Sequence, residues 1–282
     1  MKQLLVNADD FGLSRGITDG IVESHRRGIV TSTSIVASGA AFAYAIAKTQ
    51  SNPNLGVGVH LTLVEELPVA PPADIPTLLS SDGRFPKSYS ALLPGLLLGR
   101  ISSGDVEREF RAQIEKCLNA GLRPTHLDSH QHVHALPSLF RLVIDLAREY
   151  GIAGIRLPRD SPRRRGNFPC DGFAQKYMLC LLSRYDAFAY RGEAFRTCDG
   201  AAGIFDSGTL SEGRLLAILD RLPDGTTELV CHPGTGDAES VTAYGHWRYA
   251  WQTELNALTS TAVRSRLQAG QVRLINYAGL NR

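Results

Sequence analysis

Short apolar runs and amphipathic runs alternate along almost the whole chain. Apolar composition or strict alternation predicts β-strands over 4–6, 31–36, 55–63, 125–128, 154–157, 228–231 and 271–275. Helical spacing predicts helices over 16–25, 40–49, 105–120, 137–150, 174–183, 211–221, 249–258 and 262–269. Repeated strand–helix units predict parallel strands with helices outside them. The pattern therefore indicates an α/β fold, either a barrel or a doubly wound sheet.

The chain is large enough to bury a substantial core. It has 282 residues, of which 43% are apolar, so it can form one large α/β domain or two small ones. No internal repeat, low-complexity tract or linker interrupts the pattern, and we predict a single domain over residues 1–282. The proline-rich segment 65–84 is long for a loop in a compact domain and is predicted to be a lid or a binding element.

Charge and cysteine content exclude several classes of protein. A net charge of +2 is too mild to predict a nucleic-acid partner, and the cluster Arg163–Arg165 is read as a solvated loop or an anion contact. Five scattered cysteines without C-x-x-C spacing indicate a reducing compartment. The first residues lack the apolar core of a signal peptide, and the leucine-rich run 92–98 is broken by Pro94 and Gly95. We expect a soluble cytoplasmic protein without a transmembrane segment.

Polar residues suited to chemistry gather at the carboxyl ends of the predicted strands. Asp9 and Asp10 follow the first strand, His60 lies late in the strand 55–63, and His232 follows the strand 228–231. The stretch 126–134 contains four histidines: His126, His130, His132 and His134. Because active sites in barrels and open α/β sheets are built at this edge, we expect these side chains to share one site.

Each of these signals also has a structural explanation. The Asp-Asp pair can cap the following helix, His60 can be a core histidine, and His232 before Pro233 can be a turn residue. Four histidines in nine residues are different, because no packing requirement explains that density. Neutral imidazole is the commonest protein ligand for a divalent metal. Together the signals predict a mononuclear metal site for hydrolysis.

Four motifs in a fixed order resemble a known family. They are NADDFG at 7–12, GVHL at 58–61, THLDSHQHVH at 125–134 and CHP at 231–233. In this order they resemble the YdjC-like carbohydrate deacetylases, which include chitooligosaccharide deacetylases and a hopanoid-biosynthesis branch. The resemblance covers nearly the whole chain. It implies a distorted (β/α) TIM-like barrel with fewer than eight regular strands and one divalent metal ion.

The resemblance also implies a role for each matching residue. It assigns the metal to Asp10, His60 and His130, the general base to Asp9 and the general acid to His232. The implied reaction is metal-dependent hydrolysis of the N-acetyl group of an N-acetylated sugar, which releases acetate and a free amine. Further residues are expected to contact the substrate or to orient a ligand: His126, Asp128, His132, His134 and Arg156. Arg156 either braces Asp9 or forms an ion pair elsewhere.

Substrate, metal and assembly stay open at this point. Mixed nitrogen and oxygen ligation suits zinc, nickel, cobalt or manganese, and magnesium less well. The substrate is a small-molecule or a lipid-linked amino sugar, and the leucine-rich run 92–98 is either a lid for the lipid or a buried helix. Trp247 and Trp251 either stack on sugar rings or pack in the core. The sequence is compatible with a homodimer as well as with a monomer.

Two other functions would account for part of the same pattern. A metal-dependent phosphoesterase on a similar barrel would place histidines near the first strand and would often hold two metals, whereas here the first strand ends in Asp-Asp. A non-catalytic sugar-binding protein with a relic metal site has no need to keep Asp9 and His232 beside the ligands. Both are therefore disfavoured against the deacetylase.

Overall fold

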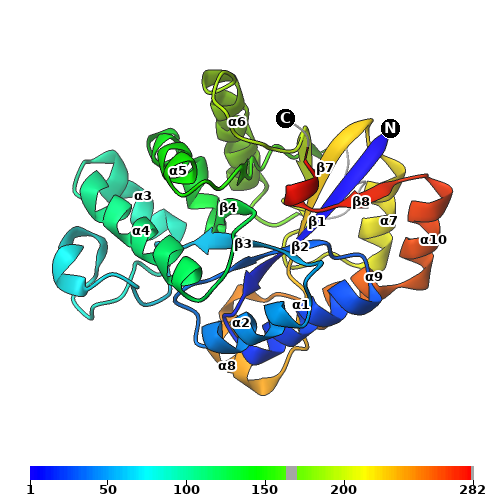
Figure 1. The fold of residues 1–282 in the computed structure, drawn as a ribbon, viewed down its shortest axis with the longest axis horizontal. Helices are drawn as coiled ribbons and strands as arrows, with labels where there is room; N and C mark the ends of the chain where they lie inside the picture. Colours follow the sequence, from blue (N-terminus) through cyan, green and yellow to red (C-terminus); the bar gives the residue numbers. More distant parts are fainter. Residues whose placement is uncertain (163–169, 281–282) are drawn as a thin grey trace.

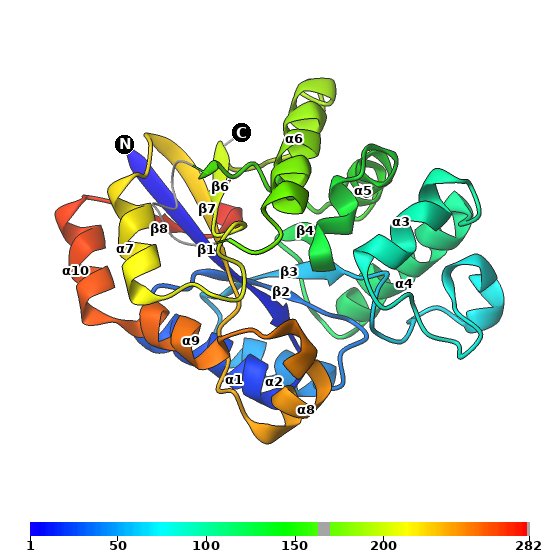
Figure 2. The same ribbon diagram turned by 180° about the vertical axis from the view of Figure 1, so that it is seen from behind.

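A curled sheet of parallel strands organises the molecule. The computed structural model describes residues 1–162 and 170–280, so the arginine cluster at 163–165 lies outside the described residues. Figure 1 shows the long first strand crossing the centre of the sheet, with helices covering its outside. Figure 2 shows the same layers from behind.

The order of the strands is that of a barrel. In sequence the strands are β1 (Lys2–Phe11), β2 (Ser32–Ile35), β3 (Gly56–Leu61), β4 (His126–Ser129), β5 (Gly154–Ile155), β6 (Gly200–Ala202), β7 (Gly225–Cys231) and β8 (Arg273–Ile275). They follow one another around the sheet as β5-β4-β3-β2-β1-β7-β6, and β8 pairs only with β1. A bridge between Gly154 and Arg196 and a hydrogen bond from Ala201 N to Arg159 O bring the two ends together. The predicted distorted TIM-like α/β barrel is confirmed.

The helices lie between and outside the strands. They are α1 (Arg15–Arg27), α2 (Phe42–Gln50), α3 (Tyr89–Leu97), α4 (Ser103–Asn119), α5 (Pro137–Glu149), α6 (Phe173–Ala189), α7 (Glu212–Asp220), α8 (Ala238–Tyr244), α9 (Trp251–Thr259) and α10 (Thr261–Ala269). Each predicted helix is found near its expected position. The short strand β6 and helix α8 were not predicted, because Gly200–Ala202 has no β-branched residue and α8 spans only two turns. Helix α3 covers most of the run 92–98, which was expected to be either a lid or a buried helix; Leu92 is buried there and Leu97 is exposed.

Helix α4 shows how most helices meet the sheet. Val106, Phe110 and Ile114 are fully buried on its inner face, at the spacing that predicted the helix. On its outer face Arg111 pairs with Glu107 and Glu149 at 2.9 and 2.5 Å. Apolar residues therefore face the core and these ion pairs face solvent, whereas two acids of α4, Asp105 and Glu109, are buried.

The long segment between β3 and α3 is fixed to α4. The carboxylate of Glu109 accepts hydrogen bonds from Val69 N and Ala70 N at 3.0 and 2.9 Å. Asp105 accepts one from Thr77 N at 2.9 Å. Two single-turn 3-10 helices, Pro72–Asp74 and Pro76–Leu78, occupy part of the segment. Buried acids on α4 therefore hold the segment in place, and its start can reach the carboxyl edge of the sheet.

Across residues 1–162 and 170–280, no helix combines the length and the apolar character needed to cross a bilayer.

Candidate metal centre

An irregularity in β1 brings both of its aspartates to one site. Ala8 is in register with Thr33 but Phe11 is in register with Ile35, so β1 uses one residue more than β2 between these pairs. Asp10 takes up this residue with a φ of 74°, in the left-handed region. In a regular strand neighbouring side chains point to opposite faces. The bulge therefore lets the adjacent Asp9 and Asp10 serve the same site.

Three side chains from three parts of the chain converge beside this bulge. Asp10 Oδ1 lies 3.0 Å from His130 Nδ1 and 3.6 Å from His60 Nε2. Asp10, His60 and His130 each offer one ligand atom, and these atoms all lie within 4.8 Å of one another. All three residues are buried. The three residues implied as metal ligands by the resemblance are therefore brought together.

The second nitrogen of each imidazole is held by a carboxylate. His60 Nδ1 lies 2.8 Å from Asp128 Oδ1, and His130 Nε2 lies 3.1 Å from Glu65 Oε2. Metal-binding histidines commonly make this contact, which fixes the ring and leaves the other nitrogen for the ion. One carboxylate and two oriented imidazoles suit a divalent cation and leave positions open for substrate and water. The donor set therefore fits a catalytic metal.

The charges of the site favour a cation. Burial alone would raise the pKa of Asp10, but the neighbouring His130 and His60 outweigh it and lower that pKa. Burial would lower the pKa of His130, but Asp10 and Glu65 raise it to about 10. Glu65, in turn, has its pKa lowered to about 2 against the effect of burial by hydrogen bonds from His130, His246 and Trp247. The acidic side chains thus stabilise positive charge at this point.

Arg156 fixes the second aspartate of the pair. Its guanidinium is fully buried and donates to both oxygens of Asp9 at 2.7 Å. It also lies 2.8 Å from Asp128 and 2.9 Å from Glu228. Burial would raise the pKa of Asp9, but Arg156 holds it well below its usual value. Of the two readings of Arg156, the structure therefore shows the contact with Asp9.

Arg156 also bears on a second cluster of possible ligands. Asp9, His60 and Asp128 lie close enough together to be considered as a metal site. The guanidinium of Arg156 lies within 2.8 Å of the carboxylates of Asp9 and Asp128. Arg156 therefore already neutralises the negative charge that a metal ion would need at this second cluster. The arrangement does not support the two-metal site of a phosphoesterase.

The four histidines of the cluster divide into two pairs. His130 and His132 line the cavity, and the backbone of His132 is left-handed, with a φ of 54°. His126 instead stacks on Tyr277, with ring centroids 3.8 Å apart and an interplanar angle of 10°. His134 lies behind the site, where Nε2 is 3.0 Å from Arg156 O. Neither His126 nor His134 lines the cavity, so a role for them in substrate contact has no geometric support.

His232 lies immediately after β7 and faces the same cavity. Its backbone N donates to Glu254 Oε2 at 2.6 Å, and its ring centroid lies 4.9 Å from that of Tyr249. His232 Nδ1 has no hydrogen-bond partner among the described residues. Burial lowers the pKa of His232 despite Asp9 and Asp10 nearby. The ring is therefore mainly neutral at neutral pH and has one nitrogen free to exchange a proton.

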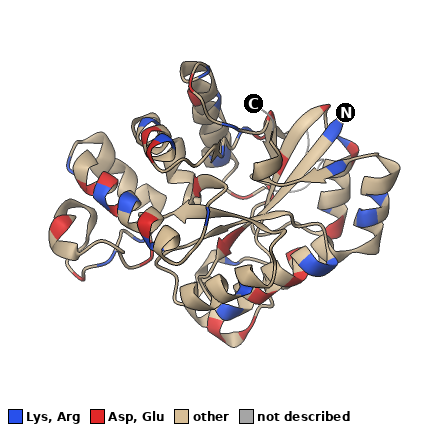
Figure 3. Cartoon of the chain, viewed as in Figure 1, with Lys and Arg blue, Asp and Glu red and all other residues tan. Residues whose placement is uncertain are grey.

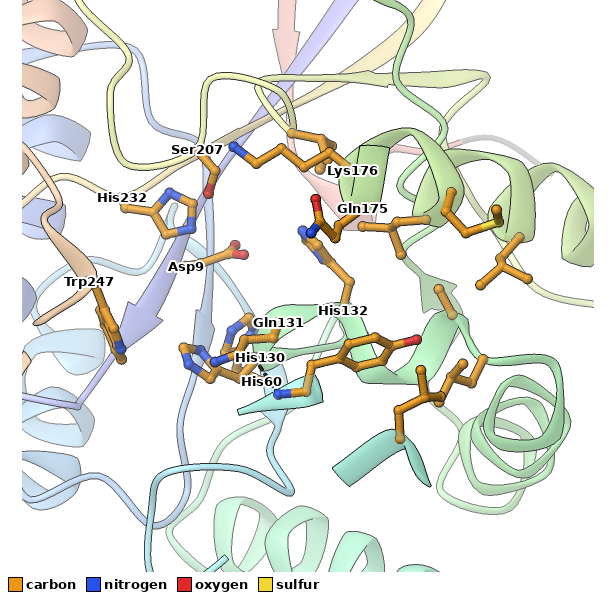
Figure 4. A pocket seen from close by; sticks show the side chains of 18 of the residues that line it. Asp9, His60, His130, Gln131, His132, Gln175, Lys176, Ser207, His232 and Trp247 are labelled. Carbon is orange, nitrogen blue, oxygen red and sulfur yellow. Dashed lines mark hydrogen bonds between the residues drawn. The ribbon is translucent and has the colours of Figure 1, made fainter. Parts of the chain in front are cut away.

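The cavity has a volume of about 760 Å³ and two chemically different ends. We call Asp9, His60, His130, His132 and His232 its polar end, and Figure 4 shows these side chains around one space. The apolar end is formed by α3, the start of α5 and α6, and its residues are Leu93, Leu136, Met178, Leu179 and Leu182. The site can therefore hold an amphipathic molecule with its polar part at the aspartates and imidazoles.

The contact between Glu65 and Trp247 was not predicted from sequence, although Trp247 was expected either to stack on sugar rings or to pack in the core. Trp247 Nε1 donates to both oxygens of Glu65 at 3.0 Å, and the Trp247 ring lies 5.1 Å from that of His130. Trp247 lines the cavity, whereas Trp251 is buried away from it. Glu65 and Trp247 are 182 positions apart, and no spacing in the sequence indicates their contact. The sequence feature closest to this contact was the segment 65–84, which begins at Glu65 and was predicted to be a lid or a binding element.

Comparison with known proteins places these observations in a family context. The sequence profile of the family described as YdjC-like protein matches residues 3–269. The chain is similar to a carbohydrate deacetylase of Brevibacillus brevis, with 32% identity over 279 residues and 99% of each chain covered. It is also similar to a carbohydrate deacetylase of Geobacillus stearothermophilus, with 32% identity over 277 residues, 98% of this chain and 97% of that one.

Two solved structures extend the comparison. One, from Enterococcus faecalis, is described as a candidate cellobiose-phosphate cleavage protein. It has a TM-score of 0.78 and 29% identity, and 98% of both chains is covered. The other is a family 4 carbohydrate esterase from Streptomyces lividans in complex with acetate. It has a TM-score of 0.50 and 10% identity, and covers 99% of this chain and 95% of that one. The second likeness concerns the fold alone.

Proposed function

The chain belongs to the YdjC-like protein family, as its motifs indicated, and on this premise we propose that it is a metal-dependent carbohydrate N-deacetylase. The reaction hydrolyses the N-acetyl group of an amino sugar and releases acetate and a free amine. One observation carries the proposal: Asp10 converges with His60 and His130, and both imidazoles line one cavity together with Asp9 and His232.

Asp10, His60 and His130 would hold the metal. A divalent cation bound there polarises the acyl carbonyl and lowers the pKa of water. One carboxylate and two imidazoles suit zinc, cobalt, nickel or manganese, and we propose an ion from this group. Asp128 and Glu65 keep the two imidazole rings in the orientation that binding requires.

Asp9 acts as the general base. Its lowered pKa keeps it ionised at neutral pH, so it is in the form that accepts a proton from the attacking water. Arg156 binds both carboxylate oxygens, and Asn7 Nδ2 donates to Asp9 Oδ1 at 2.9 Å. These contacts weaken Asp9 as a base but fix its position, which supports a role in directing the water toward the carbonyl carbon.

His232 acts as the general acid. Because its pKa is lowered, it must first gain a proton, and Asp9, which has taken one from the water, passes that proton to His232 across the cavity that both line. The C–O bond forms, the C–N bond of the amide breaks, and the departing nitrogen takes the proton from His232. The second proton of the water leaves the newly formed acetic acid and is taken up by the amine, so the products are acetate and the amino sugar as its ammonium form, and the proton count balances without another reactant.

The apolar end of the cavity supports a substrate in which the amino sugar is linked to a lipid. Leu93 on α3 and Leu179 and Leu182 on α6 are half-buried and line this end. A free sugar has no apolar group to bury there, whereas the first isoprenoid or alkyl units of a lipid-linked sugar would remove these side chains from water. Trp247, beside the imidazoles, is placed to stack on the sugar ring.

We further propose that the protein works in the cytoplasm. All five cysteines are free thiols, and four of them are buried. Unpaired cysteines in this number are typical of a reducing compartment.

The proposed function is tested by acetate release from a panel of N-acetylglucosamine compounds. The panel contains the free sugar, short oligomers and a lipid-linked form, each with and without a chelator. We expect release from at least one member, loss of release with chelator and recovery when a divalent metal is added back. Release that is insensitive to chelator, or no release from any member by metal-loaded protein, would contradict the proposal.

A further inference from the structure

Helix α6 presents an apolar face to solvent. The exposed side chains recur at a spacing of three or four residues, which places them on one face of the helix. They are Phe173 (44% exposed), Tyr177 (42%), Leu181 (39%), Tyr185 (56%) and Phe188 (67%). Soluble proteins seldom leave a contiguous apolar patch of this kind without a partner.

The side of α6 that packs on the protein is mixed in character, and Leu179 and Leu182 on it are half-buried against the core. Cys180, Ser183 and Asp186 are buried against the rest of the protein. Neither carboxylate oxygen of Asp186 has a hydrogen-bond partner among the described residues. Figure 3 shows α6 mostly without charge, whereas α4 carries blue and red along its surface. Because its aromatic and aliphatic side chains are exposed to water, the exposed face of α6, which we call the α6 outer face, is suited to an apolar environment.

We propose that the α6 outer face docks on a lipid bilayer that contains anionic headgroups. Tyrosine and phenylalanine suit the membrane interface, where an amphipathic helix buries its apolar side chains at the boundary between headgroups and acyl chains. From 173 to 191 the cationic side chains are Lys176, Arg184 and Arg191, and the one carboxylate is the buried Asp186. Lys176 lines the cavity and donates to Phe205 O at 3.3 Å, so the exposed charge of this stretch comes from Arg184 and Arg191. This charge is positive and complements an anionic surface.

The position of α6 beside the cavity favours a bilayer over a protein partner. Ala174, Gln175 and Met178 line the cavity and are also exposed, so they mark its opening on the helix that carries the α6 outer face. Figure 1 shows α6 projecting from the body of the protein. A second copy of the chain on this face would cover the opening. A bilayer there would instead supply the lipid-linked sugar, and in this respect the inference rests on the proposed function.

Vesicle flotation of the full chain tests the docking. The probe is vesicles of phosphatidylcholine and phosphatidylglycerol in equal amounts, compared with phosphatidylcholine alone. We expect the parent to float with the mixed vesicles and the combined variant Leu181→Ser, Tyr185→Ser, Phe188→Ser to bind them at least about tenfold more weakly. The matched control is Val241→Ser on α8, which is 52% exposed and should float like the parent.

A charge variant keeps the test valid if the triple variant fails to fold. Arg184→Glu leaves every apolar side chain in place and should weaken binding to the mixed vesicles several-fold, with a difference that salt removes. None of the substituted residues lines the cavity, so release of acetate from a soluble substrate should not change.

The possible outcomes separate docking from catalysis. A folded parent that does not float with mixed vesicles overturns the docking proposal. So does a parent dimer that the triple variant dissociates, because the α6 outer face would then be a contact between two copies. Flotation without acetate release from any substrate supports the docking and counts against the proposed function.

Discussion

The polar and apolar ends of the cavity are built from different parts of the fold. At the polar end His60 and His232 come from strand ends, and buried groups fix two of the side chains there: Arg156 holds Asp9 and Asp128 holds His60. At the apolar end the lining comes from helices, and Met178 is 55% exposed. The contrast shows that strand ends supply fixed geometry for a reaction. The helices supply a surface that can accept the variable part of a substrate.

The largest effect should come from removing a metal ligand at the polar end. Asp10→Asn keeps the shape and tolerates the left-handed backbone, but it loses the negative charge. We expect loss of bound metal and a fall of kcat of about a thousandfold or more, since the ion supplies both carbonyl polarisation and activated water. Metal content and acetate release measure this. Asp224→Asn, at an exposed site, is the control, and full metal occupancy in Asp10→Asn would disprove the assignment.

Asp9→Asn should separate the base from the metal site. We expect metal content like that of the parent and a kcat lower by about 10²–10⁴-fold, as for loss of a general base. Metal analysis and steady-state kinetics on the same preparation provide the comparison. Turnover near that of the parent would show that another group takes the proton.

Glu65→Gln should have a smaller effect at the same end. Glu65 contacts His130 but does not line the cavity, so it is a positioning residue. We expect metal affinity to fall about 10–100-fold, with activity recovered at high metal concentration. Glu66→Gln is the neighbouring control, because Glu66 bonds to Tyr244 and not to a ligand. Equal metal affinities of Glu65→Gln and Glu66→Gln would show that Glu65 does not position His130 for metal binding.

At the apolar end, Leu93→Ser should discriminate between substrates. Loss of an apolar contact should raise KM for a lipid-linked substrate about tenfold and leave KM for a short soluble one nearly unchanged. Leu97→Ser is the control, because Leu97 lies one turn away on α3 and is 74% exposed. A similar rise in KM for both substrates would indicate a general disturbance and not a lipid contact.

The smallest effect concerns the buried acid of α6. Burial raises the pKa of Asp186 to about 7. Because this folded-state pKa lies above that of the unfolded chain, its contribution to stability is complete below about pH 4 and is lost as pH rises through about 7. Relative to Asp186→Asn, the parent should therefore lose a few degrees of Tm between pH 6 and pH 8. Calorimetry of both proteins measures the difference, and parallel Tm curves would show that Asp186 has a partner in solution.

The polar end could be predicted from sequence because a simple rule governs it. Parallel strands bring their carboxyl ends to one edge, so residues that follow the strands, such as Asp10 and His232, must approach one another. His126 was part of the same cluster but lies earlier in β4, where it packs on Tyr277. Position relative to the strand end, and not residue type, separates it from His130.

The apolar end and the contacts between loops could not be predicted in this way. Glu65 meets Trp247 because two long connections fold over the same edge, and neither has a period that fixes its path. The helix at 174–183 was predicted correctly but ended six residues early. Its pattern shows that one face is apolar, but not that this face points away from the core.

The bulge at Asp10 has a consequence for how such a centre can change. Without the extra residue, β1 would run in regular pleats and send one aspartate behind the sheet, away from its neighbour. The protein would then keep either the metal ligand Asp10 or the proton acceptor Asp9 in the site, and lose the other. The irregular backbone is thus what lets two adjacent aspartates take two different roles. Engineering that straightens this strand would remove one of these roles and stop a reaction that needs both.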